Sequence, residues 1–265
     1  MFDLTPMNIT PLVFALLVLA ALCAGWIDAV VGGGGLVQLP ALMIAFPTAA
    51  PVHLLATNKL SSICGTTTSS ITYLRRVRPD LRTALPLAVL AFAGSLAGAL
   101  VASHIPRSAF NPVILVVLIL VGAYTLLKPS MGEATDLRFS GTRHYAYAGL
   151  AGLGIGFYDG ALGPGTGSFF VFALVGLIGY GFLEASAKAK IANFATNLAA
   201  LAIFVPQGAP WWGLGLAMGA ANVIGGYLGA RTAVAKGSRF IRVVFVLVVS
   251  AFVIRIGWDT IQQFR

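Results

Sequence analysis

Two glycine-rich stretches inside apolar runs are the part of this sequence best suited to bind a ligand. The first reads GWIDAVVGGGGLVQLP from Gly25 to Pro40, and the second reads GFYDGALGPGTGSFF from Gly156 to Phe170. Consecutive glycines and a Gly-Pro-Gly sequence both break a helix. A short helix that begins after such a break presents unpaired amides at a positive dipole end. The pattern predicts an anion site at each break, with a tight turn that only permits close packing as the alternative.

A lysine and several amides and hydroxyls follow each break. Lys59 lies in ATNKLSS and Lys190 lies in AKAKIANFATN, both inside apolar runs. A lysine there usually faces a cavity or a partner, and it could neutralise an anionic substrate; the alternative is a lysine that snorkels to the interface. The neighbouring polar residues could instead only join helices. We predict a substrate site formed by Gly33, Gly34, Gly35, Gln38, Asn58, Lys59, Ser62, Gly163, Gly165, Thr166, Gly167, Lys190, Asn193 and Asn197.

One carboxylate precedes each break, Asp28 in the first and Asp159 in the second. Three roles are open for this pair: to pair with a lysine, to cap the short helix, or to carry a coupling proton. A carboxylate is a poor direct partner for an anion, so we assign these residues a proton-coupling or structural role. No metal-ligand cluster and no Walker, G-x-S-x-G or HExxH motif occurs, so we predict no catalytic residues, no metal, no cofactor and no enzyme activity.

The composition sets the environment in which these residues act. Of the 265 residues, 58% are hydrophobic and only 9% are charged, against roughly 25% charged in a typical soluble chain. So few charges cannot cover the surface of a soluble globule, so soluble enzymes and nucleic-acid binders are excluded. The net charge of +9 then indicates the positive-inside bias of a membrane protein. The predicted partners are a small anion and the lipid bilayer, with no nucleic acid.

Apolar runs of helical length recur along the chain. A spanning helix needs ~20 residues, because it rises ~1.5 Å per residue across ~30 Å of hydrocarbon. Eight of the runs reach or approach that length, whereas 36–47 and 167–181 are too short to span upright. The runs are predicted at about 11–31, 36–47, 53–74, 83–103, 108–127, 144–162, 167–181, 185–205, 211–230 and 239–259.

A shift of 131 residues aligns the second part of the sequence with the first. It places Asp28 on Asp159 and Lys59 on Lys190, together with several glycines of the breaks. A lone aspartate and a lone lysine inside apolar runs would not readily align by chance, so we predict an internal duplication. The predicted units are a first repeat at 1–128, a cytoplasmic linker at 129–142 and a second repeat at 143–265.

The basic loops change places between the two repeats. The loop after 53–74 carries four arginines, whereas its counterpart, 206–213, carries no charge. In the next loop the second repeat is the basic one. Because Lys and Arg favour the cytoplasmic side, the repeats have opposite orientations, and both termini are predicted outside. Either two crossings or a re-entrant hairpin at the start of each repeat leaves an odd number of crossings, so both remain open.

These features predict an all-α integral membrane protein, an inverted-topology repeat of two five-segment halves with broken or re-entrant helices. Inverted repeats with short interrupted runs at equivalent positions are typical of secondary transporters. The alternatives are an anion channel lined by the same breaks and a non-transporting membrane assembly protein. Small-residue pairs, Gly94/Gly98 and Gly225/Gly229, serve close helix packing or a homodimer.

The same residues resemble the TauE/SafE family, also called the 4-toluene sulfonate uptake permease family. The resemblance covers nearly the whole chain and rests on AGWIDAVVGGGGLVQLPAL, ATNKLSS, GFYDGALGPGTGSFFVFAL, AKAKIANFATN and GGYLGAR. Gly32 to Gly35 and Gly163 to Gly167 match the family's glycine-rich breaks, and Lys59 matches its TNK motif. The resemblance implies a multi-pass transporter of the bacterial inner membrane, built from two inverted halves. It implies sulfite or organosulfonate-type sulfur oxyanions as substrates, which we expect to move by alternating access.

Overall fold

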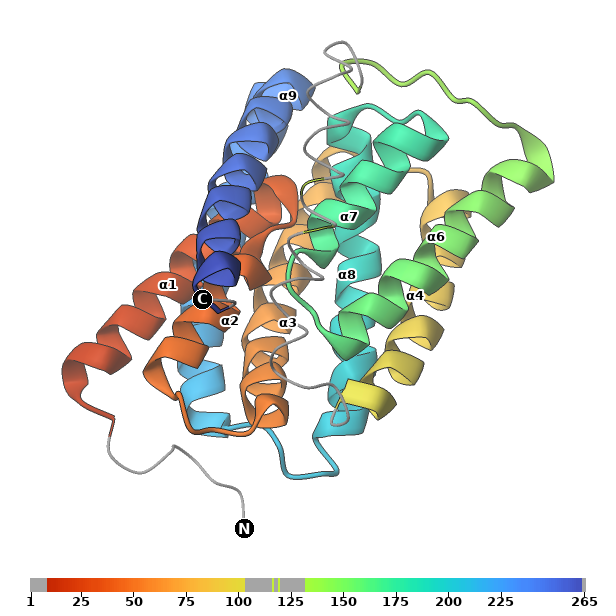
Figure 1. The fold of residues 1–265 in the computed structure, drawn as a ribbon. Coiled ribbons are helices and arrows are strands. Elements are labelled where there is room, and N and C mark those ends of the chain that lie inside the picture. The colour runs from red at the N-terminus through yellow and green to blue at the C-terminus, as the bar shows by residue number, and fades with distance from the viewer. Residues whose placement is uncertain (1–8, 103–115, 117–118, 120–131, 264–265) are drawn as a thin grey trace.

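The computed structural model describes residues 9–102, 116, 119 and 132–263, and every regular element in these ranges is a helix (Figure 1). The prediction of an all-α protein is therefore confirmed for this part of the chain. The helices begin and end close to the predicted runs, while the run predicted at 108–127 falls almost entirely outside the described residues. The helices are α1 Pro11–Val31, α2 Gly34–Ala45, α3 Pro51–Arg76, α4 Leu81–Val101, α6 Gly141–Ala161, α7 Thr166–Ala173, the π-helix Leu174–Ile178, α8 Phe182–Phe204 and α9 Trp212–Gln263.

The last helix combines two predicted runs, 211–230 and 239–259. It consists of two helices that meet at a kink, where Gly237 has φ 73° and ψ −170°, which is not helical. Glycine accepts this positive φ without a steric penalty. The chain turns there, so α9 runs up one side of the molecule and then back down (Figure 1).

Local sequence sets both ends of α1. Thr10 caps its first turn by accepting a hydrogen bond from the Val13 amide at 3.3 Å, and Pro11 occupies the first helical position. At the other end Gly32 adopts a left-handed conformation, φ 82°, and its amide donates to the Asp28 carbonyl at 2.7 Å. The first glycine of the GGGG stretch is therefore the residue that stops the helix.

Glycines also allow the outer helices to pack closely. α4 lies along α6, α1 lies along the first part of α9, and α3 and α8 lie between these pairs. A Cβ atom at Gly94 would overlap the Leu153 carbonyl oxygen, and one at Gly225 would overlap that of Leu22. The small-residue pairs therefore serve helix packing within one chain. The homodimer stays a prediction.

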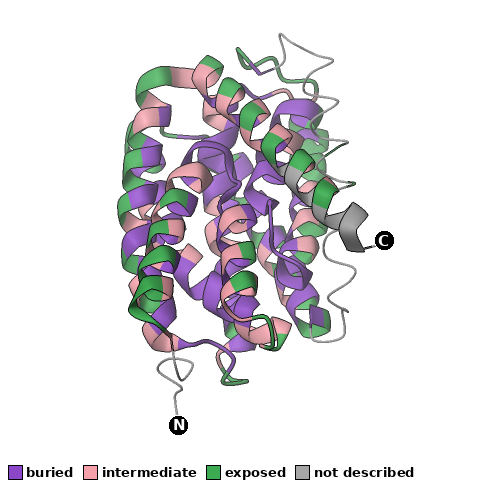
Figure 2. Cartoon of the chain, turned by 60° about the vertical axis from the view of Figure 1, so that its left-hand side comes forward, coloured by how far each residue is buried: buried purple, intermediate pink, exposed green. Residues whose placement is uncertain are grey.

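Exposed residues lie along the outward faces of the helices (Figure 2), and many of them are large and apolar. Leu12, Leu16 and Leu19 of α1 are each more than half exposed, as are Val89 of α4 and Leu150 of α6. α1 and α4 are long and apolar enough to cross a membrane by length and composition alone. The other long helices carry polar side chains that lie buried inside the molecule, which lowers their hydropathy without changing their apolar outer faces.

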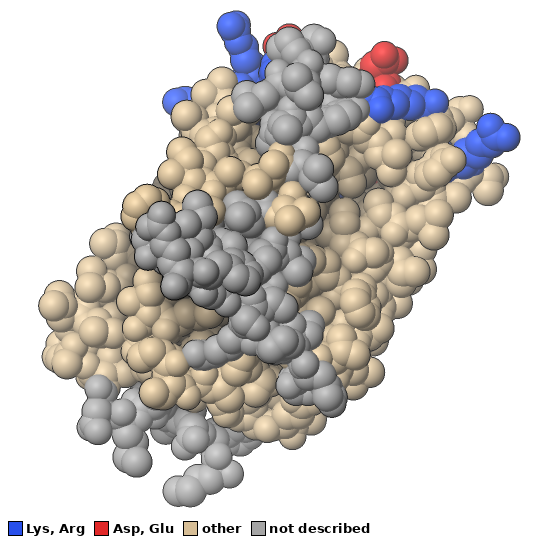
Figure 3. Space-filling model, in the orientation of Figure 1, with Lys and Arg blue, Asp and Glu red and all other residues tan. Residues whose placement is uncertain are grey.

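Basic residues gather at one end of the molecule (Figure 3). Arg75 and Arg76 lie in the last turn of α3, and Arg82 lies in the first turn of α4. The turn within α9 reaches the same end, where the Leu183 amide donates to the Ser238 hydroxyl at 3.1 Å. The end of α3, the start of α4 and the turn within α9 thus lie together at the basic end of the molecule, which is the upper end of Figure 3.

Candidate functional site

The two glycine-rich breaks lie against each other in the middle of the molecule. The Ser168 amide donates to the Gly32 carbonyl at 3.0 Å, and the Ser168 hydroxyl donates to the Val31 carbonyl at 2.9 Å. A Cβ atom at Gly32 would overlap the main chain of Gly167. Glycine is required here for two reasons, a left-handed backbone and direct contact between two main chains.

Each break belongs to a helical hairpin that returns to the end from which it starts. In the second hairpin, His144 near the start of α6 bonds through Nε2 to the hydroxyl of Tyr180, which follows the π-helix, at 3.0 Å. In the first, Phe46 after α2 packs on Trp211, beside the first residues of α9, with ring centroids 4.8 Å apart. α2 has 12 residues, about 18 Å at 1.5 Å per residue, and cannot cross the hydrocarbon core. The geometry of the short segments is thus that of hairpins.

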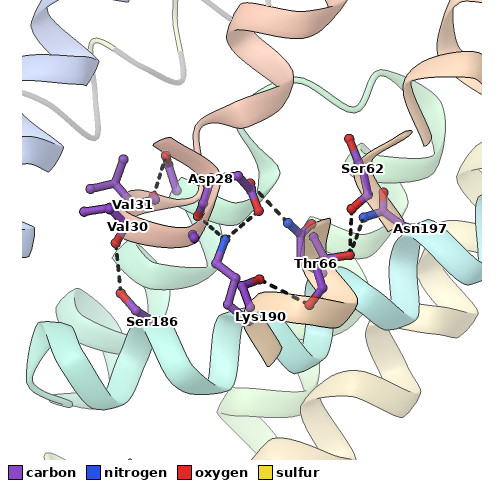
Figure 4. Close-up of polar contacts among 12 residues, drawn as sticks. Asp28, Val30, Val31, Ser62, Thr66, Ser186, Lys190 and Asn197 are labelled. Carbon is purple, nitrogen blue, oxygen red and sulfur yellow. Dashed lines mark hydrogen bonds and ion pairs between the residues drawn. The ribbon is translucent and has the colours of Figure 1, made fainter. Parts of the chain in front are cut away.

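Two buried ion pairs link the first part of the chain to the second (Figure 4 shows the pair at Asp28). Lys59 Nζ lies 2.6 Å from Asp159 Oδ2, and Lys190 Nζ lies 2.9 Å from Asp28 Oδ2. The side chains of Lys59 and Lys190 are 2% and 0% exposed, so neither lysine snorkels to an interface. Of the three roles considered for the aspartates, pairing with a lysine is the one observed. Neither caps a short helix, because the N-cap positions are Gly33 and Gly165.

The end of α1 is held by side chains from other helices. Lys190 also donates to the Asp28 carbonyl, and the Asn193 amide donates to Asp28 Oδ1 at 3.5 Å. The Tyr73 hydroxyl donates to the Ala29 carbonyl at 2.9 Å. The Ser186 hydroxyl donates to the Val30 carbonyl at 3.5 Å (Figure 4). The last carbonyls of a helix lack partners within that helix, and inside a membrane no bulk water replaces them. These side chains supply the missing donors.

A small cavity of about 20 Å³ lies where the breaks, the ion pairs and the polar faces of α3 and α8 meet. That volume holds about one water molecule. Ten of the predicted substrate-binding residues line it, together with both aspartates and Gly32. The predicted residues in the wall are Gly35, Asn58, Lys59, Ser62, Gly163, Gly165, Thr166, Gly167, Asn193 and Asn197, with Asp28 and Asp159.

Four predicted site residues lie outside this wall. Lys190 is held beside it by Asp28. Gln38 is engaged elsewhere: its amide donates to the Asn58 carbonyl at 3.4 Å, and its oxygen accepts from Asn222 at 2.8 Å. Gly34 packs against the Ala24 carbonyl, and Gly33 lies beside the side chain of Val248, so both serve packing.

Tyr73, Ser186 and Asn222 also belong to this region, and none of them was predicted from the sequence. Asn222 is 4% exposed and fits against Gly25 and Gly65, where a Cβ atom would overlap it. One signal was available in the sequence: a single asparagine inside an otherwise apolar run needs a partner. The partner of each of these residues lies far away along the chain, so the pairing itself could not be read from the sequence.

The cavity combines features suited to an anion. The first amides of α7 begin at Thr166 in its wall, at the positive end of a helix dipole. The Lys59 ammonium adds a full positive charge, balanced by Asp159. Asn58 also lines the cavity, and its buried Oδ1 has no hydrogen-bond partner within the described part of the chain.

Comparison with known proteins identifies the family of this chain. The family model Sulfite exporter TauE/SafE matches residues 17–256. The chain is 39% identical to the probable membrane transporter protein ORF9 of Sinorhizobium sp over 95% of both chains. It is 34% identical to the probable membrane transporter protein YfcA of Escherichia coli strain K12, over 96% of this chain and 93% of that protein. No solved structure gives a significant match. The chain therefore belongs to the TauE/SafE family of membrane transporters.

Proposed function

We propose that the protein is a secondary transporter that moves small sulfur oxyanions, sulfite or organosulfonates, across the bacterial inner membrane by alternating access. The observation that carries this proposal is the cavity between the two helix breaks, where helix-start amides and Lys59 face one enclosed space. The substrate class follows the description of the family, and its chemistry fits the wall. An oxyanion accepts hydrogen bonds from main-chain amides and from an ammonium group.

The two halves, 1–128 and 143–265, are in this proposal inverted copies joined by the linker 129–142. Several observations support the inversion. In Figure 1, α1 and α3 run from the lower to the upper end, and their counterparts α6 and α8 run the opposite way. The helix pairs α1–α9 and α4–α6 exchange under the proposed symmetry, and so do the two ion pairs. Each half then has one hairpin and three crossings. The third crossing of the first half is the predicted run 108–127, which lies almost entirely outside the described residues, and that of the second half is the part of α9 after Gly237.

The basic end of the molecule faces the cytoplasm in this proposal. Lys and Arg near the ends of membrane helices favour that side. With the basic end inside, α1 enters from the outer side, and both termini lie outside. The hairpin α1–α2 then opens to the outer side and the hairpin α6–α7 to the inner side, which gives one break to each access route.

The two ion pairs that connect the proposed halves support alternating access. Lys59 joins α3 to the end of α6, and Lys190 joins α8 to the end of α1. The cavity has room for about one water molecule, so a sulfur oxyanion can enter only if the helices around it move apart. Separation on one side would break one pair while the other holds, so that the site opens to one side at a time.

The test is uptake of ³⁵S-labelled sulfite into proteoliposomes that contain the purified protein. Lys59→Ala and Lys190→Ala are expected to lower the initial rate at least about ten-fold, because each removes an ammonium from the site or from its boundary. Lys236→Ala, at an exposed lysine of the basic end, is the matched control and should retain the rate. Unchanged transport in both site variants would reject the assignment. Large single-channel currents would show that the protein is an anion channel and not a carrier.

A further inference from the structure

The side-chain amides of Gln38 and Asn222 form a chain of contacts that ends at the wall of the cavity between the breaks. Gln38 of α2 is 0% exposed, and Asn222 of α9 is 4% exposed. The Asn222 amide nitrogen donates to Gln38 Oε1 at 2.8 Å, and Gln38 Nε2 donates to the Asn58 carbonyl of α3 at 3.4 Å. Asn58 belongs to the wall and directly precedes Lys59. One pair of amides thus joins three helices beside the cavity.

The Asn58 carbonyl fixes the orientation of both amides. A main-chain carbonyl only accepts hydrogen bonds, so the part of Gln38 that faces it must be the NH₂ group. Gln38 Oε1 then points the other way and needs a donor, which is the NH₂ group of Asn222. Reversal of either amide would place two acceptors or two donors against each other. The two side chains therefore form a directional link and not an interchangeable polar contact.

Glycines on two further helix segments make room for Asn222. A Cβ atom at Gly65 of α3 would lie 1.8 Å from Asn222 Oδ1, and one at Gly25 of α1 would lie 2.9 Å from the same atom. The Oδ1 side of the Asn222 amide therefore lies against main chain, while its NH₂ group reaches Gln38.

The aligned positions in the second part of the chain lack this pair of amides. A shift of 131 residues places the two positions on Phe169 and Ala91. The helix contact itself recurs. A Cβ atom at Gly25 would overlap the Asn222 carbonyl oxygen, and one at Gly156 would overlap the carbonyl oxygen of Ala91. Close packing of these helices thus needs only a small residue, so the amide at position 222 has a purpose other than packing.

Gln38 is placed to act on the cavity through its neighbours. Gly35, which lines the cavity, lies one turn earlier on the same face of α2, and its amide is among the unpaired first amides of that helix. The bond to the Asn58 carbonyl links this end of α2 to the part of α3 that carries Lys59. Both kinds of donor serve the proposed anion site, so their spacing decides how well they reach one anion together.

We propose that Gln38 is a positioning residue of the transport site, which holds the start of α2 and Lys59 at the spacing that an oxyanion requires. Asn222 acts through Gln38, by fixing the direction of its amide. Gln38 lies outside the wall and does not touch the anion itself. The inference rests on the proposed transport function and assigns a residue to the geometry of that same site.

The experiment measures ³⁵S-sulfite uptake into proteoliposomes as a function of sulfite concentration. Gln38→Met conserves the size of the side chain and removes both hydrogen bonds, so the variant is expected to fold. The KM is expected to rise at least about five-fold while kcat changes less than about two-fold, because the donors are still present but displaced.

Thr57→Val is the matched control. Thr57 is buried next to Asn58, and its hydroxyl accepts from the Trp211 amide at 3.1 Å, but it takes no part in the wall. This variant also loses a buried hydrogen bond of α3 and should keep the KM of the parent protein. A KM for Gln38→Met no higher than that for Thr57→Val would overturn the proposal.

A double variant tests whether Asn222 acts through Gln38. Asn222→Ala introduces the residue found at the aligned position 91, disturbs Gln38 without replacing it, and should also raise the KM. Gln38→Met/Asn222→Ala should have no higher KM than Gln38→Met alone, since the link is already broken. Effects that multiply in the double variant would contradict a role of Asn222 through Gln38.

Hydrogen–deuterium exchange of the purified protein tests the same link without transport. Exchange of the α2 amides at 41–45 should be at least about three-fold faster in Gln38→Met than in the parent and unchanged in Thr57→Val. Equal exchange in the two variants would show that Gln38 does not hold α2 and would overturn the proposal. A parent protein without sulfite uptake would reject the proposed function instead, and the exchange rates would still decide whether Gln38 holds α2.

Discussion

The two ion pairs occupy equivalent places but differ in their surroundings. The Lys59–Asp159 pair is short, 2.6 Å, and both side chains are 2% exposed. The Lys190–Asp28 pair is longer, 2.9 Å, and the Asp28 side chain is 14% exposed and also accepts from Asn193. A pair that solvent reaches is partly screened, whereas a dry pair depends entirely on its partner. The two contacts are thus similar in kind, but only the Lys190–Asp28 pair has a carboxylate with appreciable accessible surface.

The largest expected effect is the removal of the dry pair's lysine. Lys59→Met leaves the Asp159 carboxylate buried without a counter-charge, which should cost about 3–5 kcal/mol of folding stability. Thermal unfolding of the purified protein in detergent measures the loss. The double variant Lys59→Met/Asp159→Leu should recover much of it, since no unpaired charge remains. A double variant as unstable as the single one would show that the packing of the lysine, and not its charge, is what matters.

A smaller effect is expected at the more open pair. In Lys190→Met, the Asp28 carboxylate keeps its contact with Asn193 and gains hydration, so the stability loss should be about half of that for Lys59→Met or less. The same unfolding measurement, on both single variants side by side, tests the difference. Equal losses would show that the 14% exposure of Asp28 does not reflect access of water to the pair.

The same contrast separates the aspartates as proton carriers. A coupling proton must reach its carrier through water, and Asp28 is the more exposed of the two. Asp28→Asn is expected to abolish sulfite flux driven by a pH gradient, while flux driven by the sulfite gradient alone remains. Asp159→Asn should lower both fluxes together, because it weakens a structural contact. Retained pH-driven flux in Asp28→Asn would show that Asp28 does not carry the coupling proton.

The sequence predicts the positions of the helices better than the partners of the buried polar residues, for physical reasons. Helix positions followed from apolar runs and glycines, because both act locally. The clustering of Asn58, Lys59, Asn193 and Asn197 could be anticipated, since polar residues inside apolar runs must face inward. The partner of each lysine could not be anticipated, because the sequence pattern does not distinguish Asp28 from Asp159 as a partner. Only the three-dimensional packing brings Lys59 to Asp159 and Lys190 to Asp28. Tyr73 was missed for the same reason: its partner is a main-chain oxygen, which carries no sequence signature.

The smallest expected effects concern the hydroxyls that support the two breaks. Tyr73→Phe leaves the Ala29 carbonyl at the buried end of α1 without the donor from Tyr73, which should cost about 1–3 kcal/mol. Tyr158→Phe removes the bond to the Pro164 carbonyl, 2.7 Å long and only partly buried, so its cost should be nearer 1 kcal/mol. Unfolding curves for the two variants, each of which loses a single oxygen atom, provide the comparison. A greater loss for Tyr158→Phe would mean that the second break depends more on its supporting hydroxyl than the first does. Exposure would then predict which ion pair contributes more stability, but not which backbone contact does.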